Sequence, residues 1–367
     1  MIFSMGFTRS DWRLSIITTV VAAVAGIAYY AKLGGSVAPF VVAAIALALL
    51  ASLVGRSVEA LGDKLGAGAT GVVQSALGNL PELFVVLFAL KAKLYDVATA
   101  TIVGSILANV LLVLGLAFLF GGIKHGRQKF GGEAARTLSM LMVLSVAALL
   151  VPSLTSALGS HASKAALHER TLSIVVSILL LGLFVASLPA SLRRQKATSK
   201  AEGADGATET PEPEHSWPLG LALAMLAITG VGAAFVSDWF VGALQPAIHT
   251  LGISEAFAGL VIVAIAGNAV ENVVGIQLAL KNQSDYALSV ILQSPLQIAL
   301  VVAPALVLLS PLVGASFTLV LSPLLIAVLI MSIVITVLVV LDGESNWLEG
   351  ATLIVLYGII ATAFWWG

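Results

Sequence analysis

Two glutamates, Glu82 and Glu271, lie 189 positions apart (82 to 271) in two copies of one motif, Gly-Asn-x-x-Glu. The other motif residues are Gly78 and Asn79 in the first copy and Gly267 and Asn268 in the second. Each glutamate falls deep within an apolar stretch, where a carboxylate costs at least about 2.5 kcal/mol on insertion scales. Neither stretch contains a Lys, Arg or His that could neutralise it. We expect the two carboxylates to bind a cation or protons within a membrane, the structural alternative being a glutamate kept protonated.

Neutral oxygen-bearing side chains accompany the two glutamates. Each motif asparagine precedes its glutamate by three residues and shares its helix face. The next apolar segments carry Ser105 with Asn109, and Ser294 with Gln297. The motif glycines permit backbone distortion that frees carbonyl oxygens, and Pro81 removes an amide donor. An all-oxygen set suits a hard cation such as Ca²⁺, whereas zinc and copper prefer His or Cys. The alternative for these side chains is helix packing or bridging.

Two further acids, Asp96 and Asp285, are also 189 positions apart (96 to 285), each at the expected start of the helix after the motif. Such a position favours an N-cap, whose side chain accepts hydrogen bonds from the first turn. We therefore expect them to have structural roles.

The elements that position these residues must lie in lipid. Hydrophobic residues make up 59% of the 367 residues, charged residues 10%, and the mean hydropathy is +1.06. Soluble domains carry about 25% charged residues, so this composition predicts an all-α polytopic membrane protein. The net charge of −1 gives no indication of nucleic-acid binding, and the absence of cysteine excludes disulfides and thiolate metal sites.

About eleven segments approach the roughly 20 apolar residues that a membrane helix needs. The expected spans are 14–32, 36–55, 70–90, 96–120, 133–153, 170–190, 217–236, 255–280, 286–309, 317–341 and 348–366. The first span follows Arg9 and Arg13 but is long for a signal peptide, so we interpret it as a retained helix. The segment 193–215 is rich in Ala, Gly, Glu, Thr and Pro, which predicts a flexible linker.

The distribution of positive charge predicts the orientation. With a cytoplasmic N-terminus, thirteen of the eighteen Lys and Arg residues fall on the inside, in agreement with the positive-inside rule. The two motif helices then run in opposite directions. The predicted organisation is an extra N-terminal helix (1–34), a first five-helix repeat (35–190), a cytoplasmic linker (191–216) and a second, inverted five-helix repeat (217–367). Inverted repeats place a shared site near the membrane midplane and support alternating access.

These residues resemble the cation/calcium exchanger superfamily, specifically its Ca²⁺/H⁺ antiporter branch. The resembling stretches are ALGNLPELFVVLFALKAKLYDVATATIVGSILANVLLVLG and SEAFAGLVIVAIAGNAVENVVGIQLALKNQSDYALSVILQSPLQIALVVAP. The resemblance implies that Glu82 and Glu271 bind the cation directly. The nearby residues that it implies are Asn79, Asn268, Ser105, Ser294, Asn109 and Gln297.

Three positions depart from the pattern of the branch. Asn272 stands where the branch usually has histidine, and Pro295 where it has a small polar residue. The pair Leu80 and Pro81 is similar to the Na⁺/Ca²⁺ exchangers, which leaves the coupling ion open between H⁺ and Na⁺.

The expected function is secondary antiport of Ca²⁺ against H⁺, with Na⁺/Ca²⁺ exchange as the alternative. A cation channel lined by the carboxylates is a second class, and an intramembrane enzyme a third, which we do not expect because the inverted repeat has no purpose there. We expect Ca²⁺ and protons as substrates, no cofactor, the lipid bilayer as a partner, and a prokaryotic inner membrane as the location. The sequence is compatible with a homo-oligomer and does not specify one.

Overall fold

The chain is almost entirely helical. The computed structural model describes residues 7–65, 77–162, 164–202 and 217–367. The first half contains α1 (Arg9–Ala31), α2 (Val37–Leu65), α4 (Leu80–Lys91), α5 (Tyr95–Leu107), the π-helix η2 (Ala108–Val113), α6 (Leu114–His125), β1 (Gln128–Lys129), α7 (Gly132–Ala162), the 3₁₀-helix η3 (Lys164–His168) and α8 (Glu169–Glu202).

The second half has a similar order of elements. It contains α9 (Leu219–Leu251), α10 (Glu255–Phe257), the π-helix η4 (Ala258–Val263), α11 (Ala264–Gly267), α12 (Ala269–Leu280), α13 (Ser284–Gln297), the π-helix η5 (Ile298–Val302), α14 (Ala303–Leu309), the 3₁₀-helix η6 (Ser310–Val313), α15 (Pro323–Val340), β2 (Glu344–Ser345) and α16 (Trp347–Phe364).

Within the described residues, nine helices are long and apolar enough to cross a membrane. A tenth span results if the bent pair Glu255–Gly267 and Asn272–Leu280, which meet at 61°, is counted as one. These spans confirm the polytopic helical class. The exact count of eleven is not confirmed, because the expected span 70–90 falls partly on residues 66–76, which lie outside the described part of the structure, and only α4 represents it.

The segment predicted as a linker begins as helix. Helix α8 continues to Glu202, and residues 203–216 lie outside the described part of the chain. The sequence 191–202 contains Leu, Arg, Gln, Lys and Ala, all of which have favourable helix propensity. The composition of these twelve positions therefore favours a helix, although they lack the apolar periodicity from which we expected one.

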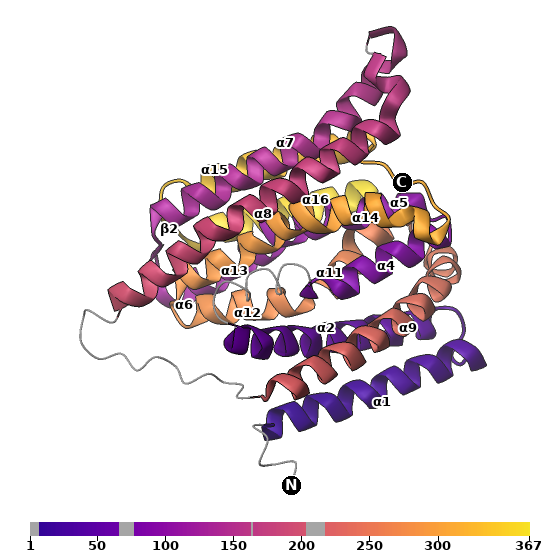
Figure 1. Cartoon of the computed structure of the whole chain (residues 1–367), viewed down its shortest axis with the longest axis horizontal. Helices are drawn as coiled ribbons and strands as arrows, with labels where there is room; N and C mark the ends of the chain where they lie inside the picture. Colours follow the sequence, from indigo (N-terminus) through magenta and orange to yellow (C-terminus); the bar gives the residue numbers. More distant parts are fainter. Residues whose placement is uncertain (1–6, 66–76, 163, 203–216) are drawn as a thin grey trace.

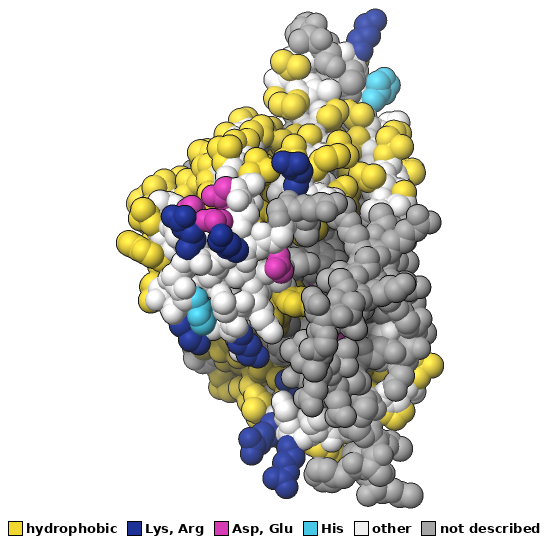
Figure 2. All heavy atoms as spheres, turned by 90° about the vertical axis from the view of Figure 1, so that its left-hand side faces the viewer, with side chains coloured by type: hydrophobic (Ala, Val, Ile, Leu, Met, Phe, Trp, Pro, Cys, Tyr) yellow, Lys and Arg dark blue, Asp and Glu magenta, His cyan; other side chains and the backbone are white. Residues whose placement is uncertain are grey.

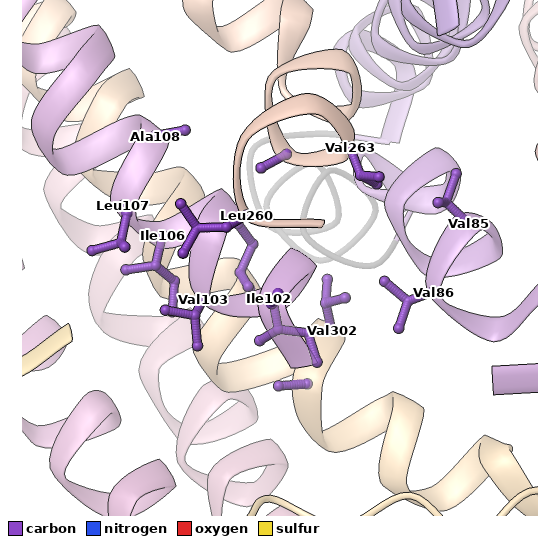
Figure 3. Close-up of a cluster of buried hydrophobic side chains, with 14 of the residues drawn as sticks. Val85, Val86, Ile102, Val103, Ile106, Leu107, Ala108, Leu260, Val263 and Val302 are labelled. Atoms are coloured by element: carbon purple, nitrogen blue, oxygen red, sulfur yellow. The ribbon is translucent and has the colours of Figure 1, made fainter. Parts of the chain in front are cut away.

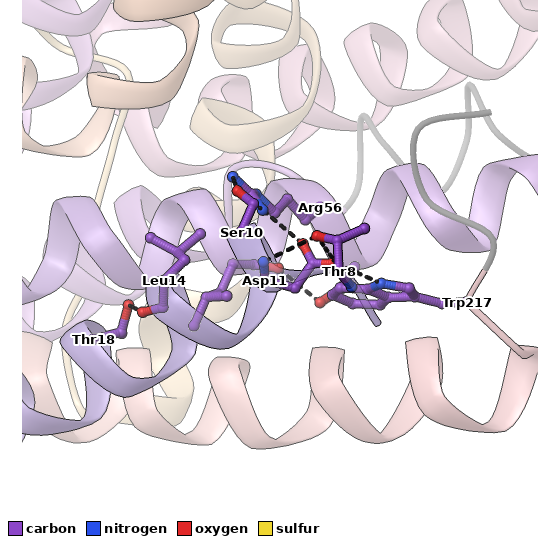
Figure 4. Close-up of polar contacts among 9 residues, drawn as sticks. Thr8, Ser10, Asp11, Leu14, Thr18, Arg56 and Trp217 are labelled. Atoms are coloured by element: carbon purple, nitrogen blue, oxygen red, sulfur yellow. Dashed lines mark hydrogen bonds and ion pairs between the residues drawn. The ribbon is translucent and has the colours of Figure 1, made fainter. Parts of the chain in front are cut away.

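Three helices form one layer of the molecule. Helix α2 packs along α9, and α1 lies beside both, at the lower edge of Figure 1. The rings of Phe40 and Phe240 stack between α2 and α9 with centroids 4.9 Å apart. Just before α2 and near the end of α9, Ser36 Oγ lies 2.6 Å from Thr250 Oγ1. At the opposite end, buried Asp11 of α1 accepts a 2.6 Å bond from Arg56 of α2 and a 3.2 Å bond from Trp217 Nε1, shown in Figure 4.

The internal repeat is visible in the backbone. Asn79 precedes α4 with φ −97° and ψ 23°, and Asn268 precedes α12 with φ −91° and ψ 19°. After these helices the chain turns at Lys93 (φ 63°) and at Asn282 (φ 60°), which are again 189 positions apart (93 to 282). A left-handed backbone is uncommon outside glycine. The two copies therefore share helix breaks and turns as well as residue types.

The two copies run in opposite directions. Helix α4 leads directly into α5, so it ends on the side of the molecule where α5 begins. The span Tyr95–His125 crosses to the other side, where Lys124 Nζ and His125 Nε2 each lie 2.9 Å from the carbonyl of Leu280, the last residue of α12. Helices α4 and α12 consequently end on opposite sides, and they extend to opposite sides of α11 in Figure 1.

Close backbone packing holds the centre of the molecule. A Cβ atom added at Gly104 of α5 would lie 2.2 Å from the carbonyl oxygen of Leu260 in η4, and one added at Gly259 would lie 2.5 Å from that of Val97. Glycine at both positions lets the two backbones approach, as is typical of membrane helices. Figure 3 shows buried apolar side chains from α4, α5, η4 and η5 filling the space around this contact, among them Val86, Ile102 and Val302.

Charged side chains gather at one end of the molecule. The short strands β1 and β2 pair antiparallel there, with Lys129 opposite Glu344, and Arg127 and Lys129 both form ion pairs with Glu344 at 3.1 and 3.4 Å. Figure 2 shows this face, with charged side chains in its middle and hydrophobic side chains along its flanks. This distribution is expected of a membrane protein seen from one aqueous side.

The expectation that Asp96 and Asp285 are N-caps is wrong. Helix α5 is preceded by Leu94 and α13 by Gln283, and neither residue makes a side-chain cap. Asp96 lies exposed in the first turn of α5, and Asp285 accepts a hydrogen bond from the backbone amide of Gly131 at 2.5 Å. The helical hydrogen bonds begin before each aspartate, because Ala98 N donates to Leu94 O and Ala287 N donates to Gln283 O, so each aspartate lies inside the first turn and not at the cap.

Candidate functional site

The motif residues lie where the membrane helices break. Asn79 and Asn268 stand immediately before α4 and α12, and neither forms a side-chain cap with its own helix. Gly78 lies in the turn before α4, and Pro81 is the second residue of that helix, where its missing amide proton is tolerated. Because the asparagine side chains do not cap their helices, they are available for contacts between the repeats.

The first glutamate packs directly against the second motif. Glu82 lies in the first turn of α4 and is 4% exposed. A Cβ atom added at Gly267 would lie 2.7 Å from Glu82 Cγ and 3.3 Å from its Oε1. A larger residue at position 267 would collide with the side chain of Glu82. The glutamate of the first motif thus contacts the glycine of the second. Glu271 is the third residue of α12, and its side chain lies outside the described part of the structure.

Hydrogen bonds join the amide side chains of the two repeats. Asn79 Nδ2 donates to Gln297 Oε1 at 2.9 Å. Asn109 Nδ2 lies 2.9 Å from Asn268 Oδ1 and 3.2 Å from Ser294 Oγ, and Ser294 donates to Asn268 Oδ1 at 3.2 Å. All five side chains are at most 9% exposed. Five of the six predicted accessory residues thus form two hydrogen-bonded groups between the repeats, which together make up the amide network and hold these side chains in place. Ser105 takes part only through its backbone carbonyl, which accepts a bond from Asn109 Nδ2 at 2.9 Å.

Several oxygens near this network are left uncommitted. Among the residues that the structure describes, Asn79 Oδ1, Asn109 Oδ1 and Ser105 Oγ are buried and have no hydrogen-bond partner. A buried polar atom without a partner costs about 1–3 kcal/mol, and a bound ion is one of the explanations for such an atom in a native protein. Amide and hydroxyl oxygens are the neutral ligands that hard cations accept. The amide nitrogens of Asn79 and Asn109 donate to protein atoms. The groups without a partner among the described residues named above are therefore oxygens.

Two features of the site were not predicted from the sequence. Asn272 lies one turn after Asn268 in α12, and its Oδ1 is also buried without a partner among the described residues. Its spacing of four from the motif asparagine was the available signal. Asn109 lies within the π-helix η2, and η5 begins directly after Gln297. Such π-helical segments are frequent at functional sites, and the apolar periodicity of the sequence does not reveal them.

Comparison with known proteins agrees with this geometry. Residues 35–192 and 221–366 match the family described as "Sodium/calcium exchanger protein", and the chain therefore belongs to this family of ion exchangers. The Ca(2+)/H(+) antiporter ChaA of Bacillus subtilis is 36% identical over 326 residues, covering 89% of this chain and 91% of the relative. The Ca(2+)/H(+) antiporter of Synechocystis sp. is 32% identical over 341 residues, covering 90% and 91%.

Solved structures share the fold. The structure of native YfkE superposes with a TM-score of 0.79 at 30% identity, covering 96% of this chain and 99% of that chain. The crystal structure of the H⁺/Ca²⁺ exchanger CAX gives a TM-score of 0.75 at 14% identity, covering 98% and 92%. The latter likeness concerns the fold alone.

The amide network generates the first prediction. Replacing Asn109 by Leu keeps the side-chain volume but leaves Asn268 Oδ1 and Ser294 Oγ without their shared donor, so the free energy of unfolding should fall by about 1–3 kcal/mol. Denaturant unfolding of the purified protein in detergent measures this change. Asn272→Leu is the matched control, because it removes an oxygen that has no partner among the described residues. An equal loss of stability in both variants would contradict the network.

Proposed function

We propose that the protein is a secondary antiporter that exchanges Ca²⁺ for H⁺ by alternating access. The observation that carries the proposal is the buried side chain of Glu82 packed against Gly267 of the opposite repeat. Oxygens of Asn79, Asn109 and Ser105 that have no hydrogen-bond partner among the described residues support it. In this proposal Glu82 and Glu271 bind either Ca²⁺ or protons. The supporting residues are Asn79, Asn268, Ser105, Ser294, Asn109, Gln297, Gly78 and Gly267.

Charge balance gives the exchange its obligatory character. Two ionised carboxylates and one Ca²⁺ sum to zero charge, and two protonated carboxyls also sum to zero. The empty site carries two negative charges with neither a bound cation nor protons in a low-dielectric region, which is costly enough to suppress its reorientation. The loaded forms change orientation and the empty form does not, so a cation crosses in one direction only when protons or another cation cross in the other.

The relatives favour protons as the coupling ion. The proteins of Bacillus subtilis and Synechocystis named Ca(2+)/H(+) antiporter match about nine-tenths of this chain. The likeness to the sodium-calcium exchanger NCX_Mj is weaker, with a TM-score of 0.53 at 19% identity, and concerns the fold alone. Leu80 and Pro81 therefore do not by themselves argue for Na⁺ coupling.

The proposal includes the placement of the chain. The N-terminus is cytoplasmic, the membrane is a prokaryotic inner membrane, and the repeats occupy 35–190 and 217–367 after an extra helix in 1–34. The charged end of the molecule at β1 and β2, where Arg127 and Lys129 lie, then faces the cytoplasm, in keeping with the positive-inside rule. Figure 2 shows this end. A channel remains the second class, and unitary conductance steps in planar bilayers would identify it.

A flux measurement tests the proposal. Proteoliposomes with an acid interior should accumulate Ca²⁺ without any Na⁺ gradient, because protons leaving through the carboxylates exchange for entering Ca²⁺. External acid should inhibit uptake competitively, since protons and Ca²⁺ share one site. Uptake of ⁴⁵Ca²⁺ under separately imposed pH and Na⁺ gradients measures both effects. Uptake that requires Na⁺ and ignores the pH gradient would establish the alternative, Na⁺/Ca²⁺ exchange.

The two carboxylates are tested separately from the coupling ion. Glu82→Gln and Glu271→Gln should each reduce Ca²⁺ exchange to the background of empty vesicles, because the amide keeps the shape of glutamate and removes its charge. Asp96→Asn is the matched control, since Asp96 is exposed in the first turn of α5, and it should keep most of the activity. Size-exclusion chromatography establishes that each variant is folded. If Asp96→Asn and Glu82→Gln lose equal activity, the site lies elsewhere.

A further inference from the structure

A groove lies between α1, α2 and α9, away from the motif residues. It has a volume of about 400 Å³, within the range of ligand pockets. Its lining is mostly apolar and includes Leu50 and Leu53 of α2 and Leu221, Met225 and Ile228 of α9. The neighbouring face of α1 exposes Ile16, Ile17 and Val20, so this part of the molecule faces the hydrocarbon of the bilayer. An apolar chain from the surrounding lipid suits these walls.

Two polar atoms of residues that line the groove need a hydrogen-bond acceptor. Trp12 and Ser15 of α1 both line it, and Trp12 Nε1 and Ser15 Oγ are buried without a hydrogen-bond partner among the described residues. Phe7 packs edge-on against the Trp12 ring with centroids 5.6 Å apart, which holds the indole in place. Leaving such groups unpaired costs about 1–3 kcal/mol each. An acceptor such as an ester carbonyl would remove this cost.

Positive charge lies at the same end of α1. Arg9 and Arg13 are exposed, and neither forms an ion pair with a carboxylate in the described part of the chain. The nearest acid in this turn, Asp11, is buried and bonded to Arg56, Thr8 and Trp217. Figure 4 shows these contacts. The two free guanidinium groups therefore suit a phosphate, which arginine binds with paired hydrogen bonds.

We propose that this groove binds one anionic phospholipid of the surrounding membrane. One acyl chain fills the apolar groove, an ester carbonyl accepts from Trp12 Nε1 and Ser15 Oγ, and the phosphate lies at Arg9 and Arg13. Arg9 and Ser15 are separated by about 9 Å along the helix axis, at 1.5 Å per residue, which is short enough for one headgroup and its ester to reach both. The lipid joins α1 to α2 and α9. This site is independent of the proposed exchange of Ca²⁺.

Native mass spectrometry of the full-length protein in detergent tests the site. The protein is titrated with phosphatidylglycerol and, separately, with phosphatidylcholine of the same acyl chains. We expect one tightly bound phosphatidylglycerol and weaker binding of phosphatidylcholine. Arg9→Gln with Arg13→Gln should remove this preference, whereas Lys32→Gln, at the other end of α1, should leave it unchanged. Equal binding of both lipids by the wild-type protein would overturn the proposal.

A second pair of variants tests the groove itself. Ser15→Leu fills the groove and removes one donor, so the affinity for phosphatidylglycerol should fall by roughly fivefold or more, the equivalent of one lost hydrogen bond. Ile16→Leu, on the exposed neighbouring position, is the matched control and should bind like the wild type. Equal affinity of the two variants would overturn the proposal. If Ser15→Leu does not fold, brominated phosphatidylglycerol tests the same question: it should quench the fluorescence of the wild type more than that of Trp12→Phe, which keeps five of the six tryptophans. Equal quenching of the two proteins would overturn the proposal.

Discussion

The structure depends on the burial of a carboxylate inside a membrane protein. Glu82 is almost completely buried in the first turn of α4, and its side chain fills the space left by the missing Cβ of Gly267. A charge in this position is tolerated only with compensation by a cation, a proton or fixed dipoles. The helix break before α4, which places Glu82 at a helix N-terminus, provides one such dipole. The break before α4 and the glycine at position 267 both make this burial possible.

The amide network joins the two halves of the chain at the candidate site. Asn79 contacts Gln297, and Asn109 contacts Asn268, so each asparagine pairs with a residue of the other repeat. Because these side chains donate through their nitrogen atoms, oxygens such as Asn79 Oδ1 and Asn109 Oδ1 are left for a ligand. The close packing of Gly104 against η4 holds the helices of the two halves together at the centre of the molecule. The groove beside α1 does not include these residues.

The sequence predicted the parts of the fold that depend on composition and repetition. The apolar spans and the offset between Glu82 and Glu271 were sufficient for the polytopic class and for the opposite directions of α4 and α12. It did not predict the π-helix around Asn109, or the oxygen of Asn272 that has no partner among the described residues, because these depend on packing between distant helices. Helix α8 runs to Glu202 instead of ending before the expected linker, and the favourable helix propensity of Leu, Arg, Gln, Lys and Ala in this segment agrees with that end point.

The central claim is that the empty site does not reorient because its two carboxylates then hold neither Ca²⁺ nor protons. Efflux of ⁴⁵Ca²⁺ from loaded proteoliposomes into an alkaline, Ca²⁺-free medium tests this claim most directly. The account predicts that the label stays inside in this medium, and that adding either unlabelled Ca²⁺ or acid outside starts its release. Rapid efflux into the alkaline, Ca²⁺-free medium, unchanged by either addition and absent from vesicles without protein, would contradict it.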